Sequence, residues 1–282
     1  MSETKHRTPD ISLFASSVRP HLWPMFFKSL EATKLDIEVV FAGDLVDPPK
    51  YPNLKYITTD KRIPPAQCYE IARRNSIGIT CGWTADDCEY DPYLLDDCYE
   101  VLKNNDKKTI IAIETNEDGR DCDINNHRFF GDNVNTYQMA PVNLMYREYL
   151  NDLGGFDSRF LCGQYENKCV TMALIDGAKI IKYTDKKVRI EHLKKHGSST
   201  KFWTGYDYDR KVLEDAYVLG GYKPSGPAYL TCIDHHKTPP MQFIRNIVNR
   251  EVLNYSQTGF VPYKDENLTT ISQCPKEWPP IC

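Results

Sequence analysis

The N-terminal half of the chain alternates between short apolar runs and amphipathic segments. The apolar runs predict strands at residues 11–15, 36–42, 54–57 and 108–114, with one more in the run from residue 78 that stops at Asp86. Helical spacing of apolar residues predicts helices at 21–32, 64–75 and 93–104. Strands that alternate with helices indicate an α/β fold with a mostly parallel sheet and right-handed crossovers.

The pattern is less regular after residue 114. The polar stretch 115–126 predicts a surface loop. Further elements are predicted as a strand at 135–141, helices at 144–153 and 165–175, and two strands at 179–183 and 187–190.

Three regions follow from these patterns. Residues 1–9 form a polar lead that we expect to be disordered, and residues 10–200 form one α/β domain. Residues 201–282 change to Tyr-rich and Pro-punctuated sequence with one helical stretch, which predicts a helical and irregular C-terminal extension. This extension either covers the sheet or forms part of a substrate-binding site, on the side of the acceptor substrate.

Composition narrows the function classes. The net charge of -4 over 282 residues gives no support for a nucleic-acid binder. No apolar run reaches 18 residues and the start has no signal-peptide core, so we expect a cytoplasmic protein with at most peripheral membrane association. The ten cysteines are scattered among apolar segments, which predicts reduced core residues rather than a disulfide framework.

The strongest candidate chemistry is the acidic pair Asp86 and Asp87. Carboxylates at the carboxyl end of a strand lie where open α/β sheets bind ligands. They are hard oxygen ligands that suit Mg2+ or Mn2+ bridging the phosphates of a nucleotide. Neighbouring residues of an extended chain point in opposite directions, so we expect one aspartate to reach the metal and the other to contact the nucleotide donor or its surroundings. The simpler alternative is a pair that only opens a turn.

Several short motifs occur in a fixed order around this pair. They are Ser17-Val18-Arg19-Pro20, Gly43-Asp44, Ala72-Arg73-Arg74-Asn75, Thr84-Ala85-Asp86-Asp87 with Pro92, Gly154-Gly155-Phe156-Asp157-Ser158-Arg159-Phe160, Tyr165-Glu166-Asn167, Gly177, and His192 with His196. This series resembles a GT-A glycosyltransferase of the family 2 type, which uses nucleotide-sugar donors. The resemblance covers residues 10 to about 200.

The resemblance implies a Rossmann-like GT-A domain and a metal-dependent, inverting hexosyl- or pentosyltransferase. A UDP-sugar is the first candidate donor, and a glycan or glycoconjugate hydroxyl is the implied acceptor. The implied roles are Glu166 as general base, Asp87 and His192 as ligands of Mn2+ or Mg2+, and Ser17, Arg19, Asp44, Arg74 and Asp86 around the donor.

Two departures leave alternatives open. Counted back from Pro92, the metal motif begins with Ala85, where the family commonly has an aspartate. The position of the base is Glu166 in one register and Asn167 in the other, and an asparagine cannot accept a proton. A catalytically silent sugar-nucleotide or glycan-binding module therefore stays open. A nucleotidyltransferase is a third class, but the Ser16–Arg19 segment lacks the Gly-rich phosphate loop that this class requires.

The implied site residues also have structural alternatives. Glu166 and Asp44 could serve as a helix-opening residue and a turn former, respectively. Arg74 could belong to a solvated helix face, and His192 could be a hydrogen-bonded surface residue.

Overall fold

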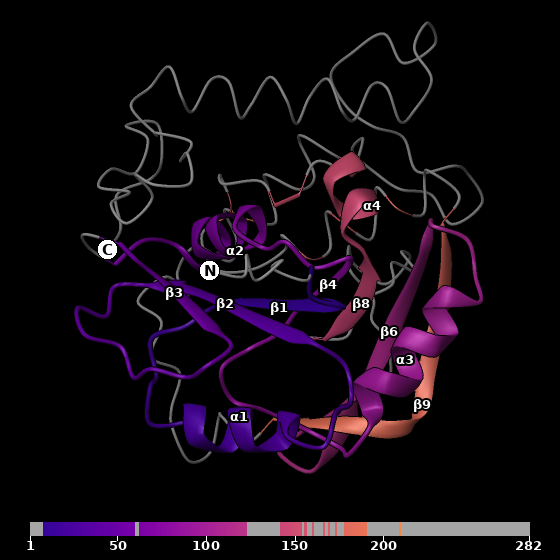
Figure 1. Cartoon of the computed structure of the whole chain (residues 1–282), viewed down its shortest axis with the longest axis horizontal. Helices are drawn as coiled ribbons and strands as arrows, with labels where there is room; N and C mark the ends of the chain where they lie inside the picture. Colours follow the sequence, from indigo (N-terminus) through magenta and orange to yellow (C-terminus); the bar gives the residue numbers. More distant parts are fainter. Residues whose placement is uncertain are drawn as a thin grey trace, which may run out of the picture.

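A computed structural model describes residues 8–59, 62–122, 142–153 and 178–190. It also describes seven separate residues: Gly155, Phe156, Phe160, Glu166, Cys169, Ala173 and Asp209. Within these residues the chain forms one nine-stranded sheet with helices packed against it (Figure 1).

The strands lie in the order β3-β2-β1-β4-β8-β6-β9-β5, and β7 pairs with β6. The first four strands of this order are parallel, as the sequence predicts: β3 (Leu54–Thr58), β2 (Ile37–Gly43), β1 (Ile11–Ser16) and β4 (Thr80–Trp83). The rest of the sheet is mixed. It contains β8 (Asn143–Tyr146), β6 (Thr109–Glu117), β9 (Lys179–Ile190), β5 (Cys88–Tyr90) and β7 (Arg120–Cys122).

Helices α1 (Trp23–Leu30) and α2 (Pro65–Arg74) lie on opposite sides of strands β1 and β2 (Figure 1). On the α1 side, the rings of Trp23 and Phe26 each lie 5.4 Å from the ring of Phe41 in β2. On the α2 side, Tyr69 packs edge-on against Phe14 of β1 at 6.4 Å. Successive residues of a strand point to opposite faces of the sheet. Because helices cover both faces of the parallel half, both faces are buried and its strands are continuously apolar. Helices α3 (Leu94–Lys103) and α4 (Arg147–Asp152) complete the described helices.

Every element predicted in the N-terminal half is present, with ends shifted by a few residues. The α/β class and the helix-flanked sheet are confirmed. The predicted surface loop at 115–126 is wrong where the structure describes it, because β6 continues to Glu117 and turns through Asp118 and Gly119 into β7. Both turn residues have positive φ, 49° and 83°, as a tight Asp-Gly hairpin requires.

Two further predictions need correction. The predicted helix 144–153 begins as strand β8 and becomes helical only at Arg147, because β8 fills the gap between β4 and β6 and satisfies their free edges. The predicted strands 179–183 and 187–190 form one strand, β9, which follows β6 across a register shift between Ile113 and Thr115. The short strand β5 was not predicted.

Several predicted regions lie outside the described residues. These are the lead before Thr8, the strand at 135–141, and the extension 201–282 apart from the buried Asp209. The division into these three regions stays a prediction.

Five cysteines are free and buried: Cys68, Cys81, Cys88, Cys98 and Cys169. Burial raises the pKa of Cys68 and that of Cys81 to about 12, which keeps both thiols protonated and unreactive near neutral pH. The prediction of reduced core cysteines is confirmed for these five.

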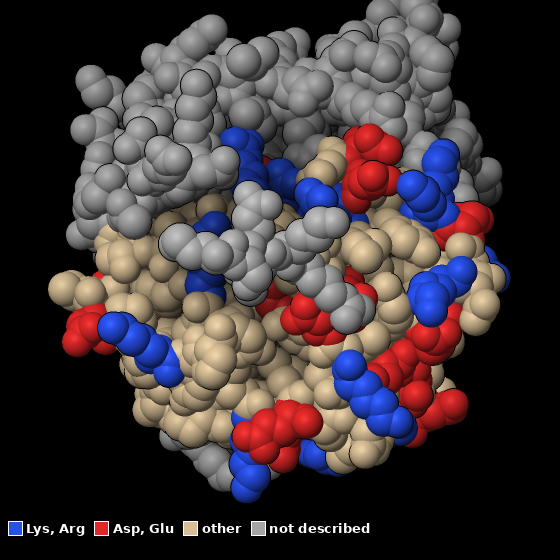
Figure 2. Space-filling view, viewed as in Figure 1, with Lys and Arg blue, Asp and Glu red and all other residues tan. Residues whose placement is uncertain are grey.

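The charged surface carries both signs. On the face shown in Figure 2, acidic and basic side chains of the described residues are interspersed among uncharged ones. This agrees with the near balance of 35 basic and 39 acidic residues. Among the described residues, no helix has the length and apolar character needed to cross a bilayer.

Candidate active site

The candidate site forms where β1 and β4 end. These strands are neighbours and parallel, with Phe14 opposite Trp83. The Thr84 N–H donates to the carbonyl of Phe14 at 3.0 Å, so the two chains leave the sheet side by side. Three residues beyond this register lie Ser17 on one chain and Asp86 on the other, which is why residues far apart in sequence meet at one edge.

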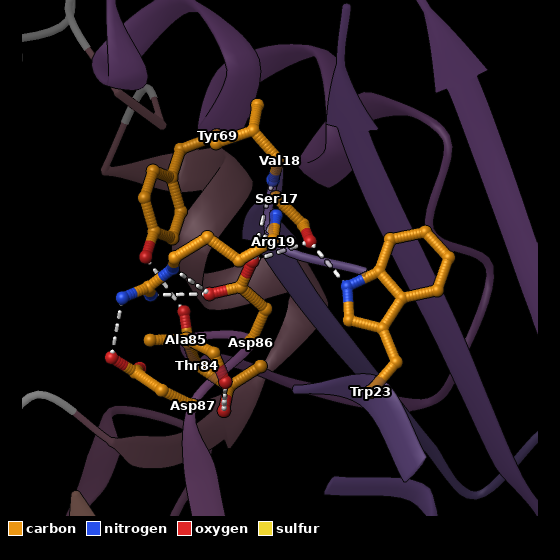
Figure 3. Close-up of polar contacts among 9 residues, drawn as sticks. All are labelled: Ser17, Val18, Arg19, Trp23, Tyr69, Thr84, Ala85, Asp86 and Asp87. Atoms are coloured by element: carbon orange, nitrogen blue, oxygen red, sulfur yellow. Dashed lines mark hydrogen bonds and ion pairs between the residues drawn. The ribbon is translucent and has the colours of Figure 1, made fainter. Parts of the chain in front are cut away.

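Asp86 is only 1% exposed and accepts hydrogen bonds from the whole segment 17–19 (Figure 3). Its Oδ2 accepts from the Ser17 hydroxyl at 2.7 Å and from the backbone N–H groups of Val18 and Arg19 at 3.3 and 3.1 Å. Its Oδ1 accepts from Arg19 Nε at 2.9 Å and from Nη2 of the same guanidinium. Both oxygens are therefore engaged, and Asp86 holds the loop that follows β1.

A second residue supports this loop from the α1 side. The indole N–H of Trp23 donates to Ser17 Oγ at 2.7 Å, and Ser17 in turn donates to Asp86 (Figure 3). Trp23 is fully buried, so this relay ties the position of the carboxylate to the core of the domain.

Asp87 is 2% exposed and is also paired with Arg19, whose Nη1 lies 2.8 Å from Asp87 Oδ2. One guanidinium thus spans both carboxylates (Figure 3). Burial by itself would lower the pKa of Arg19, but the charges of Asp86 and Asp87 outweigh burial and raise that pKa above its ordinary value. Arg19 therefore stays a cation beside the two carboxylates.

The residues present suit a divalent cation at Asp87. The Asp87 carboxylate is a hard oxygen donor, and a positive group already lies at hydrogen-bond distance from it. Among the described residues no group of three or more His, Cys, Asp or Glu side chains could hold a metal. Further ligands would come from a diphosphate and, by prediction, from His192, which lies outside the described residues.

Tyr69 of α2 connects the acidic pair with the predicted base. Its hydroxyl donates to the carbonyl of Thr84 at 2.6 Å, two residues before Asp86 (Figure 3). Burial raises the pKa of Tyr69 well above its ordinary value, and the charges of Glu166, Asp86 and Asp87 raise it further. Glu166 therefore lies within electrostatic reach of the same phenol as the two aspartates. It is half-buried and belongs to a helical turn.

Asp44 follows β2 at the same edge of the sheet. Its carboxylate pairs with Arg62 at 2.8 Å, and both side chains are partly exposed. Nearby, the Tyr56 hydroxyl donates to the carbonyl of Ser17 at 2.9 Å and accepts from the N–H of Leu45 at 3.2 Å. These contacts link the chain ends after β1 and β2.

Arg74 belongs to a separate ionic cluster, which it forms with Glu70 and Arg73. Its Nε lies 2.6 Å from Glu70 Oε1, and Arg73 pairs with the same carboxylate at 2.7 Å. Glu70 is buried and also accepts the backbone N–H of Phe156 at 2.9 Å. Glu70 therefore anchors the glycine segment that precedes Glu166, and it engages Arg74 through Nε.

The second position of the Gly154-Gly155 pair requires glycine. It has a φ of 66°, and a Cβ at this position would lie 2.6 Å from both Arg73 Cζ and Glu70 Oε2. The position thus needs glycine for its backbone conformation and for its packing against the Glu70 cluster. Gly154, Asp157 and Arg159 lie outside the described residues.

We expect Gly155→Ala to destabilise the protein by about 3 kcal/mol, because strain and steric overlap add. Gly119→Ala is the matched control, since Gly119 also has positive φ but open space around its Cβ position. The control should cost about 1 kcal/mol. Urea unfolding of both variants measures the difference, and equal losses would show that the Glu70 packing contributes nothing.

Acid should weaken the Glu70 cluster. Burial alone would raise the pKa of Glu70, but Arg73 and Arg74 lower that pKa to about 2. Because the folded-state pKa lies below the unfolded value of about 4.5, this stabilisation is complete above pH 4.5 and is lost as the pH falls toward 2. We expect Glu70→Gln to remove up to about 3 kcal/mol at pH 7 and to flatten the acid limb of the stability curve.

Unfolding free energies from pH 7 to pH 2 measure this effect. Glu100→Gln serves as the control, because Glu100 pairs with Lys103 on an exposed helix face. A Glu70→Gln curve parallel to that of the unsubstituted protein would contradict the role of the cluster.

Sequence reasoning missed five residues of the site region: Trp23, Tyr56, Tyr69, Glu70 and Arg62. Glu70 carried a usable signal, because it precedes Arg73 and Arg74 by three and four residues on a helix, where side chains meet. Tyr69 and Arg62 had no such signal, since their partners Thr84 and Asp44 are distant in sequence.

Comparison with known proteins supports the fold. No family model and no curated protein matches the chain. Among solved structures, the chain is similar to S. aureus TarS 1-349 in complex with UDP, with 14% identity and a TM-score of 0.54 over 91% of this chain and 76% of that one. It is also similar to the mannosyltransferase PcManGT from Pyrobaculum calidifontis in complex with GDP-Man and Mn2+, with 13% identity and a TM-score of 0.54 over 91% and 78%.

A third structure, GalNAc-T7 with UDP, GalNAc and Mn2+, matches at 11% identity with a TM-score of 0.47. It covers 76% of this chain, but the chain spans only 49% of GalNAc-T7. At these identities the likeness concerns the arrangement of the backbone.

Proposed function

Because the chain has the GT-A fold of these glycosyltransferases, we propose that it is a metal-dependent, inverting glycosyltransferase of the family 2 type. The donor would be a nucleotide-diphosphate sugar, with a UDP-sugar as first candidate, and the acceptor a hydroxyl of a glycan or glycoconjugate. We expect the reaction to take place in the cytoplasm, with at most peripheral membrane association.

One observation carries this proposal. Asp86 and Asp87 meet Arg19 beyond the carboxyl ends of the parallel strands β1 and β4, where α/β sheets bind ligands. Glu166 would share this site with the acidic pair, although about 80 residues separate them in sequence. The raised pKa of Tyr69, to which burial and then the charges of Glu166, Asp86 and Asp87 contribute, supports this part of the proposal.

The residues would divide the work as follows. Glu166 would accept the proton of the acceptor hydroxyl while that oxygen attacks the anomeric carbon and the bond to the diphosphate breaks. Attack from the face opposite the leaving group inverts the anomeric centre. Asp87, with His192, would hold Mn2+ or Mg2+, which supplies Lewis-acid stabilisation of the diphosphate charge when bound.

The donor would contact the edge formed by the loops after β1 and β2. The Ser17 hydroxyl and the Arg19 backbone N–H donate to Asp86, which fixes the position of the loop that would lie beside the diphosphate. Asp44 would contact the nucleoside, and Arg74 would reach the donor with the guanidinium nitrogens that Glu70 does not engage. The residues that contact the transferred sugar would determine whether it is a hexose or a pentose.

A donor screen tests the proposal. Nucleotide release from UDP-sugars and GDP-sugars is followed with Mn2+, with Mg2+ and with EDTA, in the presence of candidate glycan acceptors. We expect turnover with at least one donor, and we expect EDTA to remove it. Binding of UDP without turnover of any donor would instead support the silent binding module, which the substitution of Ala85 for the first family aspartate favours.

A further inference from the structure

We propose that the guanidinium of Arg19 is a counter-cation that occupies the metal-binding position at Asp87 until a nucleotide diphosphate binds and accepts its hydrogen bond instead. Metal binding would then depend on nucleotide binding, so that the free protein discriminates against metal alone. This inference rests on the proposed function, because it assumes that a diphosphate and a divalent cation meet at the acidic pair.

The first argument is electrostatic. Asp86 and Asp87 are adjacent and nearly fully buried, at 1% and 2% exposure. Two neighbouring carboxylates out of water cannot both stay ionised without a nearby cation. Arg19 supplies that charge, and its side chain is itself only 20% exposed.

The second argument is the shape of the guanidinium. Nε and Nη2 contact Asp86, while Nη1 alone reaches Asp87 at 2.8 Å (Figure 3). A cation that binds Asp87 through Oδ2 competes with Nη1 for that oxygen, and one that binds through Oδ1 meets the charge of the same guanidinium. The contacts with Asp86 do not have to break, so that the loop after β1 keeps its position while one hydrogen bond is exchanged.

The third argument concerns what replaces the lost bond. A diphosphate offers Arg19 oxygen acceptors that match the planar fork of its guanidinium. Once Nη1 donates to a phosphate, Asp87 can bind the metal, and the metal neutralises the diphosphate in turn. By linkage, each ligand then strengthens the binding of the other by the same factor.

The test measures Mn2+ binding directly, from the electron paramagnetic resonance signal of free Mn2+, with and without UDP. The variant is Arg19→Gln, which removes the charge but keeps a hydrogen-bond donor for Asp86. We expect Arg19→Gln to bind Mn2+ roughly tenfold more tightly than the unsubstituted protein when UDP is absent. We also expect UDP to strengthen Mn2+ binding less in the variant than in the unsubstituted protein.

Two controls separate this effect from others. Lys107→Gln removes the same charge at an exposed ion pair with Glu148 and should leave Mn2+ affinity unchanged. Asp87→Ala should abolish Mn2+ binding and thereby locate the site. If Arg19→Gln does not fold, Arg19→Lys carries the test, because lysine keeps the charge but cannot span both carboxylates, and it should shift the affinity in the same direction by a smaller factor.

The outcomes distinguish this inference from the proposed function. Unchanged Mn2+ affinity in the Arg19 variants, with binding lost in Asp87→Ala, would overturn the role of Arg19 and leave the metal site intact. Failure of the unsubstituted protein to bind Mn2+ at any UDP concentration would overturn both proposals. Tighter Mn2+ binding by Arg19→Gln without turnover of any donor would support Arg19 as counter-cation while the proposed function fails.

Discussion

Replacing Asp87 with alanine should abolish metal-dependent turnover of the donor, with a loss of about a hundredfold or more. Asp87 is the proposed metal ligand, because both oxygens of Asp86 are engaged by residues 17–19, whereas Asp87 pairs with Arg19 through Oδ2. Loss of Asp87 therefore removes a metal ligand without removing the support of the loop. Nucleotide release measured over a range of Mn2+ concentrations gives the size of the effect.

Asp121→Ala is the matched control for Asp87→Ala. Asp121 is an exposed aspartate of β7 that pairs with Lys187, away from the acidic pair, and its removal should leave turnover unchanged. Thermal unfolding of both variants shows whether the fold persists. Full Mn2+-dependent activity in a folded Asp87→Ala protein would exclude Asp87 as the metal ligand.

Glu166→Gln should remove sugar transfer while leaving the affinity for UDP unchanged. Glutamine keeps the shape of the side chain but cannot accept the proton of the acceptor hydroxyl, and loss of a general base costs about 10²–10⁴-fold in rate. Transfer to an acceptor and UDP affinity by calorimetry are measured on the same preparation, so that binding and chemistry are separated.

Glu148→Gln provides the control for this change, because Glu148 lies on an exposed face of α4 and pairs with Lys107. Transfer at the unsubstituted rate in Glu166→Gln would move the base to another residue. A parallel loss of UDP affinity would mean that Glu166 acts on the donor rather than on the acceptor.

The fold could be predicted from sequence where the pattern of apolar residues was strong. Strands β1, β2 and β4 are buried on both faces, so that they appear as short apolar runs, and α1 and α2 show one apolar face each. The hairpin of β6 and β7 escaped prediction because its residues are polar and an Asp-Gly turn resembles a loop in composition. The strand β8 escaped because three apolar residues beside a helix fit either structure.

The candidate site could be predicted only in part. The order of motifs selected Asp86, Asp87 and Arg19, and the structure brings these three into contact. The motifs did not show that Arg74 also pairs with Glu70, and its contact with the donor stays a prediction. The reason is that helical spacing places two arginines near one another but does not say which acidic partner they meet. His192 lies outside the described residues, so its role stays a prediction.

The sequence by itself determined which residue types this protein has for chemistry and where the parallel strands of its N-terminal half lie. Apolar periodicity is a local property, and so is the position of an acidic pair after a strand. Only the tertiary structure decided which carboxylate is engaged by the loop after β1, and that one guanidinium spans both. Such contacts join residues almost 70 positions apart, and their geometry depends on the pairing of β1 with β4, which no local pattern encodes.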